Sequence, residues 1–418
     1  MKILVIGSGG REHAIAKKFL ESSRVTAVFV AKGNAGMQKD GIQLVDIDEN
    51  NHVELIAFAK KAAIDFTFVG PEVPLAAGIV DDFESEGLRI FGPRKNAAII
   101  EGSKDFAKQL MKKYHIPTAK SETFTDIVRA VDYIEENGAP IVIKADGLAA
   151  GKGVVVAETV DEAVDAVVAM LSGNKFGKSG ARVVIEEFLV GEEFSLLNFV
   201  KDDQFYPMII AQDHKRAFDD DKGSNTGGMG AYAPVAHIAQ SVVDDAVETI
   251  VKPTVEAMIE EGRSFTGILY AGLILTETGP KVIEFNARFG DPETQVVLPR
   301  LTSDFAQIID DLLDNRTPEI TWEADGVTLG VVVASNGYPE DYQNEIPLPD
   351  LSQITSEIYY AGVKEVAGQL VSNGGRVLLF ARSAKTIAKA QEELYTEIDQ
   401  VKFDGFFYRH DIGSKALR

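Results

Sequence analysis

The amino-acid sequence predicts a multidomain protein that combines α/β and α+β layers, with an open parallel sheet at its N-terminus. Three observations predict this fold class. The chain has 418 residues, which suggests more than one domain. Over the first hundred residues or so, short apolar runs alternate with helical periods, which is typical of a parallel sheet covered on both faces. Further along, strands separated by glycine turns replace this alternation, which indicates a different kind of layer.

These changes in pattern divide the chain into three expected domains. We expect an N-terminal α/β layer over 1–102 and a central domain over 103–326, which contains a small α+β lid at about 121–190. A small mixed C-terminal domain should follow over 327–418.

The elements of the N-terminal layer follow from its apolar runs. Near-continuous apolar segments predict strands at 3–7, 25–30, 66–70 and 88–92. Helical periods between them predict helices at 11–20, 52–62 and 74–86.

The central and C-terminal domains are predicted from turn signals as well as from apolar runs. In the lid we expect helices at 126–137 and 158–171, and strands at 141–146, 153–158 and 182–189. Strands at 193–200 and 205–212 precede a long polar loop at 213–232. A hairpin should join 265–277 to 281–288 through Thr-Gly-Pro, and C-terminal strands should lie at 327–335, 374–383 and 406–413.

Composition narrows the classes of function. The formal charge of −22, with no Lys/Arg-rich block, disfavours sequence-independent binding to nucleic acid. The absence of cysteine excludes disulfides and thiolate sites, and the six histidines lack metal-ligand spacing, so a bound metal should be hard and oxygen-ligated. With no apolar stretch of about 18 residues and no signal-peptide pattern, we expect a cytoplasmic protein that does not contact membranes.

The glycine turn "GSGGREH" at 7–13 follows a strand and opens a helix. Glu12 replaces the third glycine of the dinucleotide-binding pattern, and the second strand lacks the acidic residue that would hold a ribose. A phosphate on the helix N-terminus and a plain structural turn therefore remain the two interpretations.

Two segments of the lid are candidates for nucleotide binding. In "KADGLAAGKGVVV" the glycines allow backbone N–H groups to approach phosphates, with charge from Lys144 and Lys152, although turn chemistry alone also explains the pattern. In "IEEFLVGEE" at 185–193, carboxylates and exposed backbone groups suit a nucleoside. Taken alone, that segment fits a solvated acidic loop at least as well.

The strand "VIEFNAR" at 282–288 carries the most specific chemistry. Strict alternation places Val282, Glu284, Asn286 and Arg288 on one face and Ile283, Phe285 and Ala287 on the other. A carboxylate beside an amide oxygen suits Mg²⁺, and the arginine fork suits phosphoryl oxygens. The alternative is a solvent-facing strand side with an ion pair.

The order of these motifs resembles the ATP-grasp superfamily of carboxylate-amine ligases. Within it, "GSGGREHA", "GNAG" (33–36), "GPE" (70–72), "EGSK" (101–104), "KADGLAAGKGV", "DHKRAFDDDKGSNTGGMGAYAP" and "RFGDPETQ" closely resemble the phosphoribosylamine-glycine ligase family over essentially the whole chain. The resemblance implies that ATP, glycine and 5-phosphoribosylamine give glycinamide ribonucleotide, ADP and phosphate through a glycyl phosphate, which is the second step of de novo purine synthesis.

The resemblance also implies roles for residues of the nucleotide site. Lys144 and Arg288 become the catalytic residues, and Glu284 and Asn286 become ligands of Mg²⁺ or Mn²⁺. ATP would bind to Lys104, Lys144, Gly147, Gly151, Lys152, Gly153, Glu186, Glu187, Phe188, Leu189 and Glu193. The strand "LYAGLIL" at 269–275 departs from many superfamily members because it offers no further acidic metal ligand.

The implied substrate site draws on three other motifs. The phosphoribosyl group would meet Gly9, Gly10, Asn34 and Gly36 in the N-terminal layer. Glycine and the attacking amine would meet Asp213, Lys215, Asn225, Thr226, Gly227, Gly228, Arg288, Asp291 and Pro292, with Asp213 engaging the glycine ammonium.

Two other functions stay open at this point. One is an ATP-grasp ligase or carboxylase acting on a different substrate, which a substrate panel would reveal. The other is a nucleotide-binding regulatory protein without turnover, which the complete set Lys144, Glu284, Asn286 and Arg288 disfavours. For the ligase we expect a lid that closes on ATP, a monomer or weak dimer, and room for a transient contact with the enzyme that makes phosphoribosylamine.

Overall fold

The computed structural model describes residues 1–148, 153–172 and 182–417. Its N-terminal layer is a parallel sheet with strand order β3-β2-β1-β4-β5. The strands are β1 (Lys2–Gly7), β2 (Ala27–Lys32), β3 (Gln43–Val45), β4 (Phe66–Val69) and β5 (Ile90–Phe91), and the helices are α1 (Gly10–Leu20), α2 (His52–Ala62), α3 (Glu72–Ala77), α4 (Ile79–Ser85) and α5 (Lys95–Gly102), with a 3₁₀ turn, η1 (Ala35–Asp40). The open parallel α/β layer is confirmed.

Apolar residues of β1 face two different cores, which explains why the strand is apolar throughout. Ile3 and Val5 pack into one cluster, and Leu4 and Ile6 pack into another on the opposite face. The expected single helix at 74–86 is instead α3 and α4, because Gly78 between them has a φ of +102°, a left-handed conformation that ends a helix.

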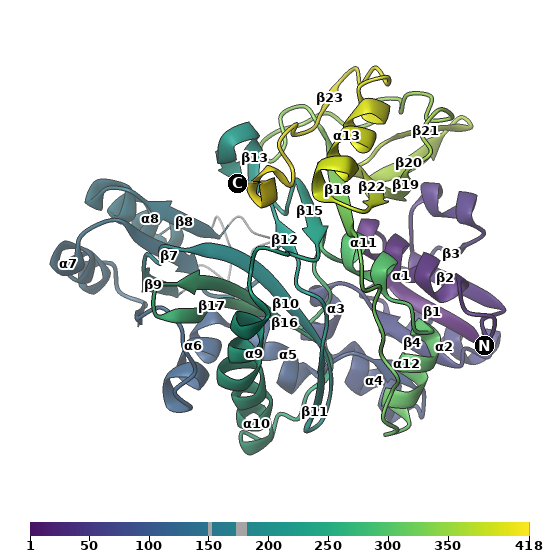
Figure 1. Cartoon of the computed structure of the whole chain (residues 1–418). Helices are drawn as coiled ribbons and strands as arrows, with labels where there is room; N and C mark the ends of the chain where they lie inside the picture. The colour runs from purple at the N-terminus through teal and green to yellow at the C-terminus, as the bar shows by residue number, and fades with distance from the viewer. Residues whose placement is uncertain (149–152, 173–181, 418) are drawn as a thin grey trace.

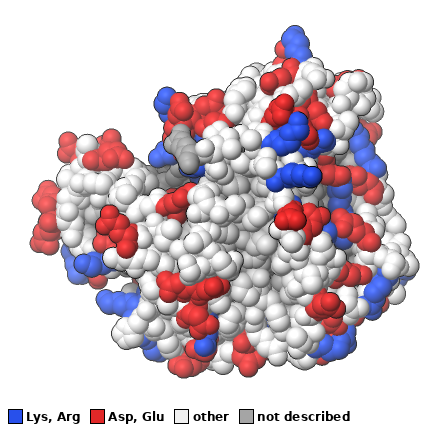
Figure 2. Space-filling view, viewed as in Figure 1, with Lys and Arg blue, Asp and Glu red and all other residues white. Residues whose placement is uncertain are grey.

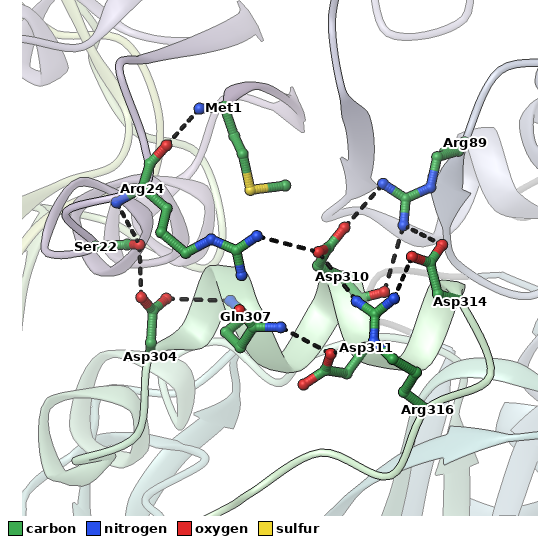
Figure 3. A network of polar contacts seen from close by, with 10 residues as sticks. All are labelled: Met1, Ser22, Arg24, Arg89, Asp304, Gln307, Asp310, Asp311, Asp314 and Arg316. Atoms are coloured by element: carbon green, nitrogen blue, oxygen red, sulfur yellow. Dashed lines mark hydrogen bonds and ion pairs between the residues drawn. The ribbon is translucent and has the colours of Figure 1, made fainter.

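A helix from much later in the chain completes this layer. In α12 (Phe305–Leu313), the ring of Phe305 stacks on Phe19 of α1 with centroids 4.5 Å apart. Figure 3 shows the polar part of the same interface, where Asp310 of α12 lies among Arg24, Arg89 and Arg316.

The lid is a four-stranded antiparallel sheet with two helices, as expected for an α+β unit. Its strand order is β6-β9-β7-β8, and α7 (Ile127–Asn137) and α8 (Val160–Ser172) pack on it around a separate apolar cluster. The strands are β6 (Ser121–Phe124), β7 (Ile141–Ala145), β8 (Val154–Ala157) and β9 (Val183–Glu187), and α6 (Lys104–Lys113) leads into them. Figure 1 shows this unit projecting from the body of the molecule.

The central sheet is antiparallel, with strand order β11-β10-β16-β17. Its strands are β10 (Glu192–Lys201), β11 (Gln204–Pro207), β16 (Thr266–Thr276) and β17 (Gly279–Asn286), so the predicted hairpin at 265–288 is confirmed. Between residue 233 and β16 the chain forms three helical segments, α9 (Gln240–Ala246), η4 (Val247–Val251) and α10 (Lys252–Glu260).

The expected polar loop at 213–232 is wrong, because most of it is strand. It contains β13 (Arg216–Phe218), β14 (Lys222–Asn225) and β15 (Gly230–Ala233), with η3 (Asp219–Asp221) between the first two. Together with β12 (Gln212–Asp213), β15 joins the sheet of the C-terminal domain by pairing with β18. The glycine and polar residues of 213–232 predict turns, and the pairing of β15 could not be predicted from them because its partner strand lies about a hundred residues away.

The C-terminal sheet has strand order β12-β15-β18-β22-β19, and β23 also pairs with β18. Its own strands are β18 (Val327–Ser335), β19 (Glu357–Tyr360), β22 (Arg376–Ala384) and β23 (Phe406–Phe407), beside a β20–β21 hairpin (Val363–Val366 and Gln369–Ser372) and α13 (Ile387–Ile398). The strand expected at 406–413 is therefore strand only over its first two residues. A terminal 3₁₀ turn, η6 (Ser414–Leu417), follows it.

The described residues include no helix that is both long and apolar enough to cross a membrane. On the face seen in Figure 2, Lys and Arg side chains lie in small groups among Asp and Glu side chains. The local mixture is consistent with a chain in which acidic residues outnumber basic ones, 64 to 42.

Candidate active site

A β-bulge in β17 sets the direction of the most informative side chains. Glu284 pairs with Gly272 and Val282 pairs with Leu273, so Ile283 is the extra residue. Val282 therefore lies in the same buried cluster as Phe285, and the expectation that it shares the face of Glu284 is wrong. The bulge was not predictable from alternation, because an extra residue shifts the period.

Beyond the bulge, the expected alternation holds. Phe285 and Ala287 lie in the core, while Glu284 and Arg288 keep contact with solvent although protein surrounds them on most sides. The free carbonyl oxygen of Ile283 accepts a hydrogen bond of 3.0 Å from Lys144 Nζ, so the bulge also links β17 to the lid.

Glu186 of the lid lies between two buried lysines. Lys108 Nζ is 2.9 Å from Glu186 Oε2, and Lys144 Nζ is 3.0 Å from Glu186 Oε1. Burial, opposed by Glu186, lowers the pKa of Lys108 to about 8. Although Lys144 is close, Glu186 Oε1 accepts no hydrogen bond from any residue that the structure describes.

Lys104 approaches the start of the glycine-rich segment. Its Nζ donates to Gly147 O at 2.9 Å, and Gly153 O accepts from Ala145 N at 2.8 Å across the β7–β8 end. Gly151 and Lys152, both predicted to bind ATP, lie outside the described residues.

The segment after β9 leads from the lid to the central sheet. Glu187 Oε1 accepts from the backbone N–H of Lys120 at 2.9 Å, and Phe188 is partly exposed. Glu193 lies near the start of β10 and is exposed to solvent. The protein packed around its carboxyl nevertheless raises the pKa of that group by desolvation, and Asp213 raises it further, although Lys215 opposes both effects. Leu189 lies between Phe188 and β10.

The basic side chains around Glu284 favour the deprotonated form of its carboxyl group. Burial would raise the pKa of Glu284, but Lys215, Lys144, Lys104 and Arg288 outweigh it and lower that pKa below its ordinary value. An ionised Glu284 beside the amide of Asn286 offers two hard oxygens, which fits Mg²⁺ or Mn²⁺ only when phosphate and water supply the rest. Among the described residues, no group of three or more acidic or histidine side chains could hold a metal unaided.

Arg288 is held by two carboxylates that the sequence did not single out. Its Nη2 is 2.9 Å from Glu101 Oε1 and its Nε is 3.3 Å from Glu72 Oε2. Glu101 Oε2 also accepts from the backbone N–H of Ala287 at 2.7 Å. Both carboxylates lie in strings that carry the family resemblance, "GPE" and "EGSK", but only the fold shows that they meet at Arg288.

A second buried polar cluster adjoins Glu284. Glu293 Oε1 accepts hydrogen bonds from Ser195 Oγ at 3.0 Å and from Tyr270 Oη at 2.9 Å. Lys215 Nζ is 3.0 Å from Asp213 Oδ2. Burial would lower the pKa of Lys215, but Asp213 and the other acidic groups around it raise that pKa well above its ordinary value, so Lys215 is a cation. Glu293 was missed because the sequence pattern marked only its neighbours Asp291 and Pro292.

The glycine pair of "NTGGMG" is fixed from both sides. Thr226 donates twice to Lys215 O, through N at 2.7 Å and Oγ1 at 2.8 Å. Gly228 has a φ of +114°, and a Cβ on it would lie 2.4 Å from Pro292 Cδ, so this position requires glycine. Arg376 of the C-terminal domain donates to Gly227 O at 2.9 Å and to Asp291 O at 2.8 Å. Asn225, the last residue of β14, pairs with Arg216.

The residues predicted to bind the phosphoribosyl group lie where the N-terminal and C-terminal domains meet. Gly9 N donates to Glu12 Oε2 at 2.7 Å, and a Cβ on Gly9 would lie 3.7 Å from Asp291 Oδ2. Gly10 is buried against Gln295, which in turn donates to Asp291 Oδ1 at 2.8 Å. This turn therefore adjoins the predicted glycine and amine site.

Asn34 and Gly36 are packed under Tyr360 of the C-terminal domain. Asn34 Nδ2 donates to Ser8 O at 2.8 Å and to Tyr360 O at 2.9 Å. A Cβ on Gly36 would lie 2.1 Å from Tyr360 Cγ, so glycine is needed for this contact. These two residues are thus engaged in the domain interface.

Comparisons with known proteins agree with this arrangement. Family models for phosphoribosylglycinamide synthetase match the chain in three parts: the N domain at 1–101, the ATP-grasp (A) domain at 102–294 and the C domain at 328–415. Curated phosphoribosylamine--glycine ligases of Streptococcus pyogenes serotype M18 and Streptococcus suis are each 63% identical over 420 residues and cover 100% of both chains.

Solved structures give the same result. The crystal structure of phosphoribosylamine--glycine ligase from Thermotoga maritima is 33% identical, with a TM-score of 0.86, and the match covers 99% of this chain and 100% of that one. The biotin carboxylase domain of 2-oxoglutarate carboxylase from Hydrogenobacter thermophilus, at 14% identity and a TM-score of 0.75, shares the fold over 97% of this chain and 91% of that one. The chain belongs to the phosphoribosylglycinamide synthetase family, and its central part is an ATP-grasp domain.

Proposed function

We propose that the chain ligates glycine to 5-phosphoribosylamine with consumption of ATP, giving glycinamide ribonucleotide, ADP and phosphate in the second step of de novo purine synthesis. Membership in the family supports the choice of substrates. The observation that carries the proposal is the group of charged side chains at β17, where an ionised Glu284 lies within the electrostatic reach of Lys104, Lys144, Lys215 and Arg288. This combination suits the transfer of a phosphoryl group between anions.

In this proposal the nucleotide lies between the lid and the central sheet. Lys104, Lys144 and the segment Gly147–Gly153, which includes Gly151 and Lys152, surround the phosphates. The adenine amino group donates to the carboxylate of Glu186, a buried group that lies between Lys108 and Lys144 at the edge of the lid. The segment Glu187–Leu189 frames the base, with Phe188 beside it, and Glu193 binds the ribose.

Glu284 and Asn286 would hold Mg²⁺ or Mn²⁺ together with phosphate oxygens. When bound, the ion would neutralise phosphate charge and fix the positions of the reacting groups. The lowered pKa of Glu284 supports this assignment, since a metal ligand must be deprotonated.

The chemistry has two steps. A carboxylate oxygen of glycine attacks the γ-phosphorus of ATP, the bond to ADP breaks, and a glycyl phosphate forms. The amine of phosphoribosylamine then attacks the glycyl carbonyl carbon, phosphate leaves with the former glycine oxygen, and the amine releases a proton. Arg288 donates its fork to the transferred phosphoryl group, and Glu101 and Glu72 support that orientation by fixing the guanidinium.

We assign the remaining predicted residues to the two acceptor substrates. Asp213 receives the glycine ammonium, and Lys215 beside it faces the carboxylate and phosphate charge. Thr226–Gly228 and Asn225, with Asp291 and Pro292, shape the space around glycine and the amine. The turn at Gly9 and Gly10, with Asn34 and Gly36 nearby, receives the phosphoribosyl group.

An isotope experiment tests this chemistry. Glycine labelled with ¹⁸O in its carboxylate should transfer one label to each inorganic phosphate, because the oxygen that attacks phosphorus leaves with it. Mass spectrometry of the released phosphate is the readout. Product formation with unlabelled phosphate would overturn the acyl-phosphate route, and no product at all would overturn the proposed function.

The proposal extends to the setting of the enzyme. We place it in the cytoplasm as a monomer or weak dimer, bound neither to membrane nor to nucleic acid. Phosphoribosylamine is unstable, so a transient contact with the enzyme that supplies it would limit its loss.

A further inference from the structure

We propose that Arg409, close to the C-terminus, is a positioning residue that holds the substrate loop, residues 213–230, in the geometry needed for glycine. This inference rests on the proposed function, because that function assigns Asp213 and Lys215 to the glycine site. Figure 1 shows β13 of the loop next to the C-terminal end of the chain.

The Arg409 guanidinium is fully buried, with the residue 1% exposed, and its donors are shared between two segments. Nε and Nη2 donate to the two carboxylate oxygens of Asp411 at 2.7 and 2.8 Å. Nη1 donates to the substrate loop, to Arg216 O and to Asp221 Oδ1, both at 3.0 Å. Because Asp411 fixes the plane of the fork, the direction of Nη1 is fixed as well.

The segment that carries Arg409 is itself anchored on α13. Tyr395 Oη donates to Arg409 O at 2.8 Å and accepts from Ile412 N at 3.1 Å. Gln391 Nε2 donates to Ile412 O at 2.7 Å. Helix α13 therefore serves as the rigid base, and Arg409 connects this base to the loop.

Neighbouring groups of the C-terminal segment reinforce the connection. His410 N donates to Asp219 Oδ1 at 2.8 Å, and Lys415 Nζ is 2.7 Å from Asp221 Oδ2. Further along, Gly413 N donates to His214 Nε2 at 3.3 Å. These contacts span the loop from His214 to Asp221.

Apolar packing does less of this work than the polar contacts. A surface hollow of about 560 Å³ lies between the loop and the C-terminal segment, lined among others by Phe218, Phe407 and Tyr408. Phe218 is more than half exposed, and its ring centroid is 5.7 Å from that of Phe407. Arg409 is thus a buried polar link between the loop and the C-terminal segment, beside this partly exposed aromatic contact.

The link acts at the predicted glycine site because Arg216 directly follows Lys215. Lys215 O is held by Thr226 and Arg216 O by Arg409, so consecutive carbonyls are fixed from opposite sides. A backbone shift of about 1 Å at this point would move Lys215 Nζ relative to Asp213 and Glu284, and such a displacement can cost about 100-fold in rate.

The test uses two substitutions in the full-length protein. Arg409→Lys removes the fork but keeps the charge, and Asp221→Asn removes the charge of a partly exposed carboxylate on the loop that pairs with Arg409 and Lys415. Matched controls are Arg382→Lys and Asp404→Asn, since Arg382 pairs with Glu393 and Asp404 with Lys402 within the same domain. Initial rates are measured with glycine and ATP varied separately, and hydrogen exchange is followed over 213–230.

We expect kcat/KM for glycine to fall about 100-fold in Arg409→Lys and about tenfold in Asp221→Asn, with KM for ATP changed less than about twofold. Exchange in the loop should rise in both variants, while both controls behave as wild type. Wild-type kcat/KM for glycine in Asp221→Asn, or equal losses for glycine and ATP, would overturn the inference. A wild-type protein without ligase activity would instead remove the proposed function, and unchanged loop exchange would still refute the link.

Discussion

At the scale of single residues, the ionisation of Glu284 decides whether the candidate site can bind a metal-phosphate complex. Lys215, Lys144, Lys104 and Arg288 keep its carboxyl deprotonated against the effect of burial. A side chain held charged in this way is costly to the fold but suited to a metal-phosphate complex.

Replacing Glu284 should therefore separate activity from stability. Glu284→Ala and Glu284→Gln should reduce glycine- and phosphoribosylamine-dependent ADP release by about 10²- to 10³-fold, because a charge that balances the nucleotide complex is lost. The thermal midpoint should not fall in Glu284→Gln. The exposed Glu277→Gln on the β16–β17 turn is the control, and near wild-type turnover in Glu284→Gln would contradict the metal assignment.

His214 makes stability depend on pH. Burial, followed by the charges of Arg409 and Lys415, lowers the pKa of His214 from 6.5 to about 4. The unfolded chain therefore takes up a proton as pH falls through 6.5, before the folded protein does. Stability that is complete above 6.5 is lost as pH falls toward 4.

Between pH 7.5 and 5, this one residue should lower the free energy of unfolding by about 2 kcal/mol. Urea unfolding at both pH values measures the loss, and His214→Asn should lose less over the same interval than wild type. His115→Asn, at an exposed histidine, should keep the wild-type pH dependence. An equal loss in His214→Asn and wild type would show that His214 is protonated in the folded state at pH 5.

At the scale of elements, α12 shows how a distant segment completes a layer. Asp310 pairs with Arg89 at 2.9 Å, Arg316 at 3.2 Å and Arg24 at 3.5 Å, so one buried carboxylate pairs with three cations (Figure 3). Removing its charge leaves these arginines without their shared partner.

Asp310→Asn should accordingly destabilise the protein by about 2 kcal/mol, since it breaks a largely buried network. Asp314→Asn, at a more exposed carboxylate of the same network, should cost less than about 1 kcal/mol. Thermal unfolding of both variants provides the comparison. A thermal midpoint of Asp310→Asn equal to that of the wild type would mean that the Asp310 contacts add nothing to the attachment of α12.

The limits of sequence prediction are clearest in elements that depend on distant partners. The parallel sheet followed from its apolar runs, and the polar side of β17 followed from alternation at Glu284 and Asn286. The bulge at Ile283 was missed because its position depends on the register with β16. The strands within 213–232 were missed for the same reason, since β15 is specified by β18 and not by its own residues.

At the scale of the whole molecule, the lid is joined to the body by a few polar contacts. Arg182 near β9 donates through Nη1 to Asp105 of α6 at 3.0 Å, while its Nε donates at 2.8 Å to Asp146 within the lid itself. Lys144 and Lys104 add contacts to β17 and to Gly147 that ATP would replace. We expect the lid to change its position when the phosphates bind.

ATP with Mg²⁺ should slow hydrogen exchange in the peptides that cover β7, β8 and the glycine-rich segment between them, because a closed lid excludes water. The same peptides with ATP and Mg²⁺ in Glu284→Gln should show weaker protection. Exchange that ATP leaves unchanged in the wild-type protein would refute the closing lid.

The residues of the candidate site come from all three parts of the chain. Glu72 and Glu101 precede the central domain, Arg376 follows it, and Arg288 and Asp291 stand where these parts meet. The sequence identified each motif separately, but the contacts between residues of different motifs depend on packing between domains. For this reason the reaction type was predictable, and the supporting carboxylates of Arg288 were not.

The proposed ligase reaction is tested by ADP release with Mg²⁺ and ATP, with glycine and freshly generated phosphoribosylamine added separately and together. We expect sustained release only when both substrates are present, in an amount equal to the glycinamide ribonucleotide detected by mass spectrometry. Sustained release with neither substrate, or a preference for formate, bicarbonate or another amino acid over glycine, would contradict it.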